Sequence, residues 1–251
     1  MTWPAGYGRR VLAEVDSTNA EAARIAAQLA GPEWILGLRQ TAGRGRRGRP
    51  WVDPVGNFAG TLVMRPTEGP EVVALRSFVA ALALYDALAG LPGLAGQVTL
   101  KWPNDVLLAG GKVAGILLES AGGPSGMSYL AIGIGVNLAS APDVADLPDG
   151  AVAPVSVAGL TGQVVGPEDF LNRLAPAYAE WESRFATYGF APIRTAWLAR
   201  AARLGERITA RTGRETLTGL FETVDAQGNL CLNTAQGRRA IPAADVFFEG
   251  G

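Results

Sequence analysis

Histidine is absent from the 251-residue chain, and this absence limits the possible chemistry more than any residue that is present. Without histidine, Ser-His-Asp and Cys-His catalysis are excluded, and so are most zinc sites. The only cysteine, Cys231, excludes a disulfide framework within the chain and is compatible with a reducing compartment. An enzyme with this composition must work by positioning, by carboxylates, by lysine or arginine, or through a metal with oxygen ligands.

The sequence also lacks an excess of charge of either sign. Charged residues make up 18% of the chain and the formal net charge is -1, so no general nucleic-acid or membrane surface is indicated. No uninterrupted apolar run of about 18 residues and no signal-peptide pattern occur, which predicts a soluble, cytoplasmic protein without a membrane partner. Hydrophobic residues make up 48%, enough for one sizeable α/β core and a small appendage.

Lysine is rare, and the two lysines present lie close together. Lys101 and Lys112 are the only lysines, whereas the other 20 of the 22 basic residues are arginines. A bias in base composition explains an excess of arginine, but under such a bias a lysine that only carries surface charge is expected to change to arginine. Arginine does not replace a compact, deeply placed ammonium group. Both lysines are therefore candidate site residues, with chance clustering of two residues as the alternative.

The hydrophobic periodicity changes at about Leu204. Up to there, strand patterns alternate with helical ones, which predicts an α+β domain over residues 1–203 with a mixed β-sheet flanked by helices. Short strands separated by turns follow, at 207–211, 215–224, 230–232 and 238–241, and predict a small β-barrel over residues 204–251. In the first domain we expect strands at 10–15, 34–39, 57–64, 98–102, 106–108, 111–119 and 129–138. We expect helices at 71–88, 167–188, 191–202 and from a Thr18–Glu21 capping box to about Ala30, with loops and a short helix over 139–165.

A Gly/Arg-rich stretch, QTAGRGRRGRPW, covers Gln40–Trp51. Its glycines match G-x-G-x-x-G, but no helix begins there, so a dinucleotide fingerprint is a weak interpretation. A nucleic-acid patch suits the arginines, but the rest of the chain is not basic. A loop that orders around an anionic ligand explains both the glycines and the charges, and such a loop excludes water from a reactive phosphate. We expect this loop to be disordered without ligand.

A second unusual stretch, LKWPNDVLLAGGKVAGILLES, covers Leu100–Ser120. Asp105 in its Pro-Asn-Asp turn can hold Mg²⁺ through oxygen or water, although a turn alone also explains these residues. Lys112 begins an otherwise apolar strand, which is unusual unless its ammonium meets an anion. Gly115 leaves space for a ligand or a closely packed backbone. A P-loop motif is absent.

Six short motifs occur in one order along the chain: DSTN at 16–19, QTAGRGRRGRPW at 40–51, GN at 56–57, KWPND at 101–105, GKVAGIL at 111–117 and GIGVN at 133–137. Together they resemble the biotin–protein ligase family, in its monofunctional form without an N-terminal DNA-binding domain. The resemblance covers about half of the chain. It implies a catalytic domain like that of class II aminoacyl-tRNA synthetases, followed by a small Src-homology-3-like barrel. ATP and biotin are then the substrates, Mg²⁺ is the metal, and a biotin carboxyl carrier protein is the partner.

The resemblance also implies roles for particular residues. Biotin is expected to lie against a set of polar and glycine residues, namely Ser17, Thr18, Asn19, Gln40, Gly43, Arg44, Gly45, Arg46, Lys112 and Gly115. ATP is expected to contact a second set, namely Arg44, Arg46, Arg49, Trp51, Asn104, Lys112 and Asn137. The catalytic residues are expected to be Lys112, Arg46, Lys101 and Asp105, with Asp105 also as the metal ligand. After Asn57 the chain reads Phe-Ala-Gly-Thr where many members have Leu-Tyr, which leaves one pocket wall undefined.

Three other functions remain open from the sequence. A lipoate or octanoate ligase has a related fold, and the Arg-rich loop with KWPND favours biotin over it. A non-catalytic biotin-binding protein does not require a phosphate site, so the two lysines argue against it. A nucleic-acid binder predicts strongly salt-dependent affinity. Only 16 residues precede the Ser-Thr-Asn turn, so we expect no DNA binding, and either a monomer or a homodimer.

Overall fold

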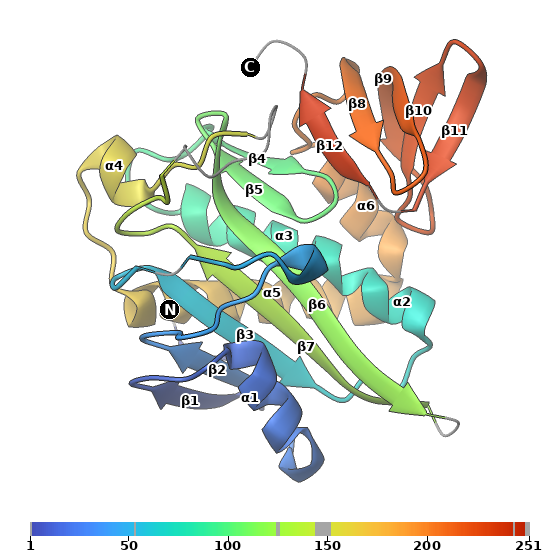
Figure 1. The fold of residues 1–251 in the computed structure, drawn as a ribbon. Helices are drawn as coiled ribbons and strands as arrows, with labels where there is room; N and C mark the ends of the chain where they lie inside the picture. Colours follow the sequence, from blue (N-terminus) through green and yellow to red (C-terminus); the bar gives the residue numbers. More distant parts are fainter. Residues whose placement is uncertain (1, 53, 124–125, 144–151, 243, 249–251) are drawn as a thin grey trace.

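The fold contains two β-sheets, seen in a computed structural model that describes residues 2–52, 54–123, 126–143, 152–242 and 244–248. The larger sheet has seven strands in the order β1-β2-β3-β7-β6-β5-β4 (Figure 1). In chain order its strands are β1 Gly8–Leu12, β2 Glu33–Gly37, β3 Phe58–Met64, β4 Val98–Lys101, β5 Asp105–Leu108, β6 Gly111–Gly123 and β7 Gly126–Val136. The β1–β2 pair is parallel and the other pairs are antiparallel, which confirms the predicted mixed sheet.

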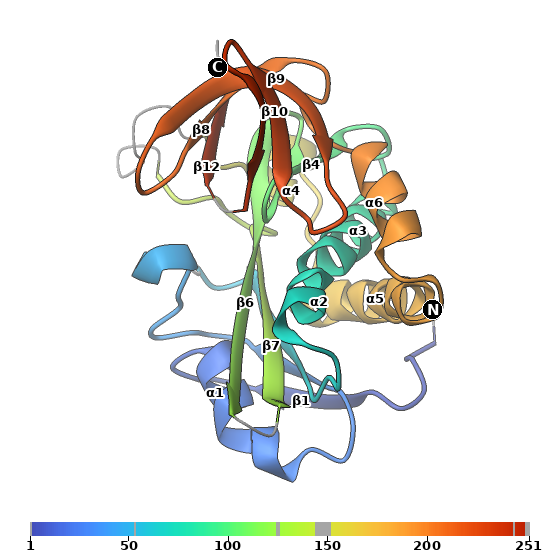
Figure 2. The same cartoon turned by 90° about the vertical axis from the view of Figure 1, so that its right-hand side faces the viewer.

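Helices lie on both faces of this sheet. They are α1 Thr18–Ile25, α2 Pro70–Ala74, α3 Arg76–Ala89, α4 Val157–Thr161, α5 Pro167–Tyr188 and α6 Phe190–Leu198, with short 3₁₀ turns η1 Ala26–Gln28 and η2 Arg46–Gly48. In Figure 2, α3 and α5 lie on one side of β6 and β7, and α1 lies on the other. The face that carries α1 is left partly open, and the loop that contains η2 crosses it (Figure 1).

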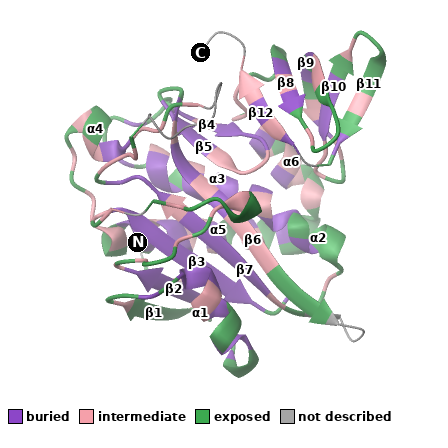
Figure 3. Ribbon diagram, in the orientation of Figure 1, coloured by how far each residue is buried: buried purple, intermediate pink, exposed green. Residues whose placement is uncertain are grey.

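The helix α3 carries apolar residues on nearly all sides, and nearly all of these sides are enclosed by other elements. Ten of its residues are buried, and it packs against both α5 and the strands β4, β5 and β6 (Figure 3). The segment Pro70–Ala89 is long and apolar enough to cross a membrane, but 67% of its apolar 18-residue window is buried inside the fold. A helix that is hydrophobic all round is expected in a protein core as well as in a membrane, and the buried share here is that of a core helix.

The smaller sheet has five antiparallel strands in the order β11-β10-β9-β8-β12. Its strands are β8 Arg207–Arg211, β9 Thr216–Val224, β10 Leu230–Thr234, β11 Gly237–Ile241 and β12 Asp245–Phe248. Four of them lie where the sequence predicted strands, whereas β12 was not predicted. In the described residues β11 and β12 do not pair, so the predicted small barrel is present as an open five-stranded sheet.

Several predicted boundaries also differ from the structure. The helix expected over 71–88 is divided at Leu75 into α2 and α3, and the first strand begins and ends earlier than predicted. The Thr18–Glu21 capping box is wrong: Ser17 is the N-cap residue, and Glu21 pairs with Arg24 instead. Residues 144–151 of the loop region predicted at 139–165 lie outside the described residues, and α4 is the short helix found in the rest.

The packing of α3 gives a direct stability test. Leu84 has no solvent exposure, so Leu84→Ala is expected to lower the free energy of unfolding by about 2–5 kcal/mol through lost burial and a cavity. Val164 is 94% exposed, and the control Val164→Ala is expected to change it by less than about 0.5 kcal/mol. Urea unfolding of the three proteins measures both values, and equal values for the two variants would contradict the enclosed position of α3.

Candidate active site

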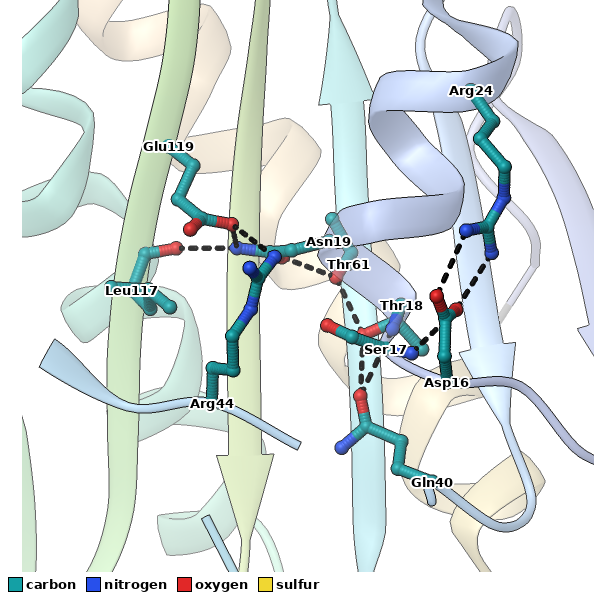
Figure 4. A network of polar contacts seen from close by, with 10 residues as sticks. All are labelled: Asp16, Ser17, Thr18, Asn19, Arg24, Gln40, Arg44, Thr61, Leu117 and Glu119. Carbon is teal, nitrogen blue, oxygen red and sulfur yellow. Dashed lines mark hydrogen bonds and ion pairs between the residues drawn. The ribbon is translucent and has the colours of Figure 1, made fainter. Parts of the chain in front are cut away.

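A network of polar contacts lies at the N-terminus of α1, where the predicted Ser-Thr-Asn turn meets the sheet (Figure 4). The backbone N–H of Thr18 donates to Gln40 Oε1 over 2.9 Å, and the Thr18 hydroxyl lies 3.2 Å from the same oxygen. Thr61 on β3 contacts both Thr18 Oγ1 and Asn19 Oδ1 at 2.7 Å. The four side chains therefore hold one another, and the predicted biotin residues of this group lie together.

The amide of Asn19 is oriented by a carboxylate that the sequence did not indicate. Asn19 Nδ2 donates to Glu119 Oε2 over 2.8 Å, and Glu119 Oε2 also lies 3.7 Å from Arg44 Nη2 (Figure 4). Glu119 thus connects the polar network to the Gly/Arg loop. Two signals in the sequence were available for the missed residues: Glu119 is a charged residue that follows an apolar run, and Thr61 is a hydroxyl within an apolar strand.

Ser17 is held from outside this network. Its backbone N–H donates to Asp16 Oδ1 over 2.8 Å, and Asp16 accepts two hydrogen bonds from the Arg24 guanidinium (Figure 4). The Ser17 side chain is buried and makes no capping hydrogen bond to the helix. A buried hydroxyl and the start of a helix, where backbone N–H groups point outward, are suited to a polar ligand.

The Gly/Arg loop folds back on itself as a small hairpin. Gly45 N–H donates to the Arg49 carbonyl over 2.7 Å, and Trp51 N–H donates to the Gly43 carbonyl over 3.0 Å. The turn at its tip places Arg47 in the left-handed region, with φ of 57°. Arg46 is directed inward, and its guanidinium donates to Asn104 Oδ1 over 3.0 Å. The expectation that this loop is disordered without ligand stays a prediction.

Trp51 lies flat on a floor made by two facing glycines. Gly115 on β6 is the register partner of Gly135 on β7, and a Cβ atom at Gly115 would lie 3.2 Å from the indole. A Cβ atom at Gly135 would overlap the indole outright. Lys112 Nζ lies 5.8 Å from the centre of the same ring. The absence of side chains at these positions is therefore what lets an aromatic ring, or a flat ligand, lie against the sheet.

Both lysines of the chain meet the same carboxylate. Lys112 Nζ lies 2.7 Å from Asp105 Oδ1, and Lys101 Nζ lies 3.5 Å from Asp105 Oδ2. The side chains of Lys101 and Asp105 are 9% and 13% exposed, whereas Lys112 is 31% exposed and so remains accessible to a ligand. This convergence supports a shared role for the two lysines over chance clustering.

Burial and charge act in opposite directions on these groups. Burial by itself raises the pKa of Asp105, but the positive charges of Lys112 and Lys101 outweigh it and hold this pKa below its ordinary value. Burial lowers the pKa of Lys101, and the attraction of Asp105 only partly offsets this. Burial also lowers the pKa of Arg46, against the opposing charges of Asp245 and Asp105. An arginine stays protonated at neutral pH nonetheless.

Two of the predicted nucleotide residues use their amides within the protein. Asn104 Nδ2 donates to the Ile116 carbonyl over 2.7 Å, which joins the Pro-Asn-Asp turn to β6. Asn137 is buried and donates to the Val155 carbonyl over 3.1 Å. Within the described residues, no group of three or more His, Cys, Asp or Glu side chains is placed to hold a metal. Asp105 is therefore not part of a preformed cluster of three such side chains in the described residues.

Several predicted site residues lie on β6 or contact it. Lys112, Gly115 and Glu119 on this strand contact Asp105, Trp51 and Asn19 respectively. Arg49 is not among them, because its guanidinium pairs with Asp245 of the C-terminal sheet at 3.3 Å. The arrangement joins a hydrogen-bonding network, a flat floor and a cationic centre. It can bind an amide-like ring at one end and stabilise phosphate charge at the other.

Both parts of the chain match known protein families. Residues 11–137 match the model of the biotin/lipoate A/B protein ligase family, and residues 204–249 match the biotin protein ligase C-terminal domain. The chain belongs to this family.

Several known proteins are similar to this chain over nearly its whole length. The chain is 60% identical over 240 residues to the biotin–[acetyl-CoA-carboxylase] ligase of Paracoccus denitrificans, covering 96% of this chain and 100% of that protein. It is 33% identical over 254 residues to the corresponding ligase of Mycobacterium tuberculosis, covering 96% and 90%. Its fold is similar to the biotin protein ligase of Aquifex aeolicus in complex with biotin and ATP, with a TM-score of 0.78, 24% identity and coverage of 95% and 97%.

The close contact between β7 and the polar network gives a second stability test. A Cβ atom at Gly133 would overlap the Asn19 amide, which Glu119 and Thr61 hold in place. Gly133→Ala is therefore expected to destabilise the fold by about 1–3 kcal/mol. Gly213 has open space around it, and Gly213→Ala serves as the control. Urea unfolding compares the two, and equal stabilities would contradict the close contact at Gly133.

The ion pairs of Asp105 predict a defined pH dependence of stability. Its pKa in the fold is below the unfolded value of about 3.9, so its stabilisation is complete above that pH and is lost as the pH falls through the folded pKa. Asp105→Asn is expected to cost about 3 kcal/mol at pH 7, and progressively less below about pH 4. Urea unfolding from pH 7 to pH 3 measures this, with the exposed Asp169→Asn as control. A difference between wild type and Asp105→Asn that is constant over this range would exclude the ionised pair.

Proposed function

We propose that this protein is a biotin–protein ligase. It activates biotin with ATP to biotinyl-5'-AMP and pyrophosphate, and then transfers biotin to a lysine of a biotin carboxyl carrier protein. The observation that carries the proposal is the convergence of Lys112, Lys101 and Asp105 beside the polar network of Ser17–Asn19. The 60% identity to a biotin–[acetyl-CoA-carboxylase] ligase over its whole length supports the same function.

The first step requires charge and alignment more than proton transfer. The biotin carboxylate is already ionised at neutral pH and attacks the α-phosphate of ATP without a base. Two anions must be brought together, so cations have to offset their repulsion. Lys112 is the accessible ammonium of the centre, and Arg46 lies on the loop side of it. Asp105, with its lowered pKa, orients Lys112 and is a weak proton acceptor.

The polar side chains at the start of α1 and the glycine floor suit two different parts of biotin. The ureido ring offers two N–H donors and one acceptor, which the hydroxyl and amide groups of Ser17, Thr18, Asn19 and Gln40 can satisfy. The floor of Gly115 and Gly135 with Trp51 supplies an apolar surface for the rest of the molecule, close to the nucleotide position proposed for Trp51. Gly43, Arg44 and Gly45 lie on the loop that covers this region.

The residues present fit a magnesium ion brought by ATP better than a resident metal. Mg²⁺ keeps several waters and uses one or two carboxylates together with substrate phosphates, and Asp105 is the carboxylate nearest the lysines. When bound, the ion neutralises phosphate charge. Asn104 and Asn137 hold the backbone around the proposed nucleotide position. In the second step, the carrier lysine attacks the mixed anhydride and AMP leaves, so no covalent enzyme intermediate is formed. We place the protein in the cytoplasm, without DNA or a membrane as partner.

Biotin-dependent exchange of labelled pyrophosphate into ATP tests this proposal. Wild type is expected to exchange with biotin and not with lipoate. Lys112→Ala is expected to lower the rate on the order of 100-fold, because it removes a cation that acts on transition-state charge. The exposed Arg214→Ala is the matched control for loss of a basic side chain and is expected to exchange at the wild-type rate.

Each alternative function gives a different result in the same assay. Exchange with lipoate and not biotin would assign the chain to lipoate ligation. Tight biotin binding without exchange would indicate a binding protein. Biotinylation of a purified carrier domain by wild type, and its loss in Lys112→Ala, completes the test of the transfer step.

A further inference from the structure

The C-terminal sheet reaches the candidate site through its edge strand β12. Asp245 Oδ2 lies 2.6 Å from Arg47 Nη1 and 3.3 Å from Arg49 Nη2, so one carboxylate binds two arginines of the Gly/Arg loop. Phe248, three residues further along the strand, lies 5.6 Å from Lys101 Nζ. In Figure 1, β12 is the edge strand of the smaller sheet. These contacts join the two units of the protein at the loop itself.

Asp245 is presented by a strand that is paired along its whole length. The strand β12 pairs with β8 from Asp245↔Arg211 to Phe248↔Ile208, and its Val246 side chain is buried. The Asp245 side chain is 26% exposed, whereas those of Arg47 and Arg49 are 45% and 59% exposed. The carboxylate is thus less exposed than the two arginines that it binds, and its short side chain loses less rotamer freedom than theirs when the cluster forms.

The hairpin of the loop separates its arginines into two directions. Arg46 turns inward to Asn104, and Arg47 and Arg49 turn outward to Asp245. Three positive charges within four residues repel one another, and they would compete for the inward position if no outer acceptor were present. Asp245 pairs with two of them and also attracts Arg46 by its charge, and Arg46 is the arginine whose guanidinium bonds to Asn104, next to Asp105 in the chain.

We propose that Asp245 is a positioning residue for the adenylation step. It holds Arg47 and Arg49 so that the loop stays folded and Arg46 is directed at the phosphate position. This inference rests on the proposed function. It assigns to the C-terminal sheet a part in the first chemical step.

Removal of the carboxylate should impair adenylation more than biotin binding. Asp245→Ala and Asp245→Asn are expected to lower kcat/KM for ATP in pyrophosphate exchange on the order of 10-fold, because a displaced Arg46 no longer meets the phosphate. Asp245→Glu keeps the charge and is expected to recover most of the activity. The dissociation constant for biotin without ATP is expected to change less than about threefold, since Ser17–Asn19 and Gln40 are held by the larger sheet.

Limited trypsin digestion with biotin and ATP present reads the loop directly. Cleavage within the loop, after Arg44, Arg46 or Arg47, is expected to be about fivefold faster in Asp245→Ala than in wild type, because the loop opens more often. Glu215→Ala is the matched control: it removes an exposed ion pair with Arg239, 2.9 Å long, from the same sheet and away from the loop. This control is expected to match wild type in both digestion and exchange.

A variant on the loop side keeps the test valid if Asp245→Ala fails to fold. Arg47→Ala is expected to reproduce the loss of kcat/KM and, at the remaining sites after Arg44 and Arg46, the faster digestion, and the double variant should be no worse than either single one. Unchanged exchange in the folded variants would overturn the proposal, even if digestion became faster. If wild type itself shows no biotin-dependent exchange, the proposed function fails instead, and the digestion comparison still decides whether Asp245 holds the loop.

Discussion

The antiparallel pairing of β6 with β7 is the constraint on which the site depends. This register sets Gly115 opposite Gly135 and Leu117 opposite Gly133, so two positions without side chains lie where the aromatic ring of Trp51 and the amide of Asn19 press against the sheet. A shift by one residue would turn these glycines to the other face. The core on that other face, formed by α3 and α5, fixes the register because it accepts only the apolar side chains.

Carboxylates organise the cations of this site, in the absence of any histidine. Asp105 joins the two lysines, Glu119 connects Asn19 to Arg44, and Asp245 holds Arg47 and Arg49. Each of these carboxylates lies on a strand, whereas the positive charges are at the ends of long lysine and arginine side chains. A reaction between two anions benefits from cations that are oriented in advance, because no reorganisation is then needed when charge develops.

The two sheets contribute unequally to this arrangement. The larger sheet supplies the polar network, the glycine floor and the lysine–aspartate centre, and the smaller sheet supplies contacts to the loop and to Lys101. The short strand β12 is the element that makes these contacts. Its four residues carry little periodic signal, which is why the sequence patterns did not reveal it, although its position beside β8 follows once the sheet is formed.

The sequence alone determined the mixed sheet, an apolar helix predicted over 71–88 and many of the residues that gather at the site. These features depend on local periodicity and on short motifs, which survive without knowledge of the fold. Only the tertiary structure decided the partners: Thr61 and Glu119 for Asn19, Asp245 for the loop, and Asp105 for both lysines. These contacts join residues up to 198 positions apart, as between Arg47 and Asp245, and such pairings follow from strand register and sheet order, which no local pattern encodes.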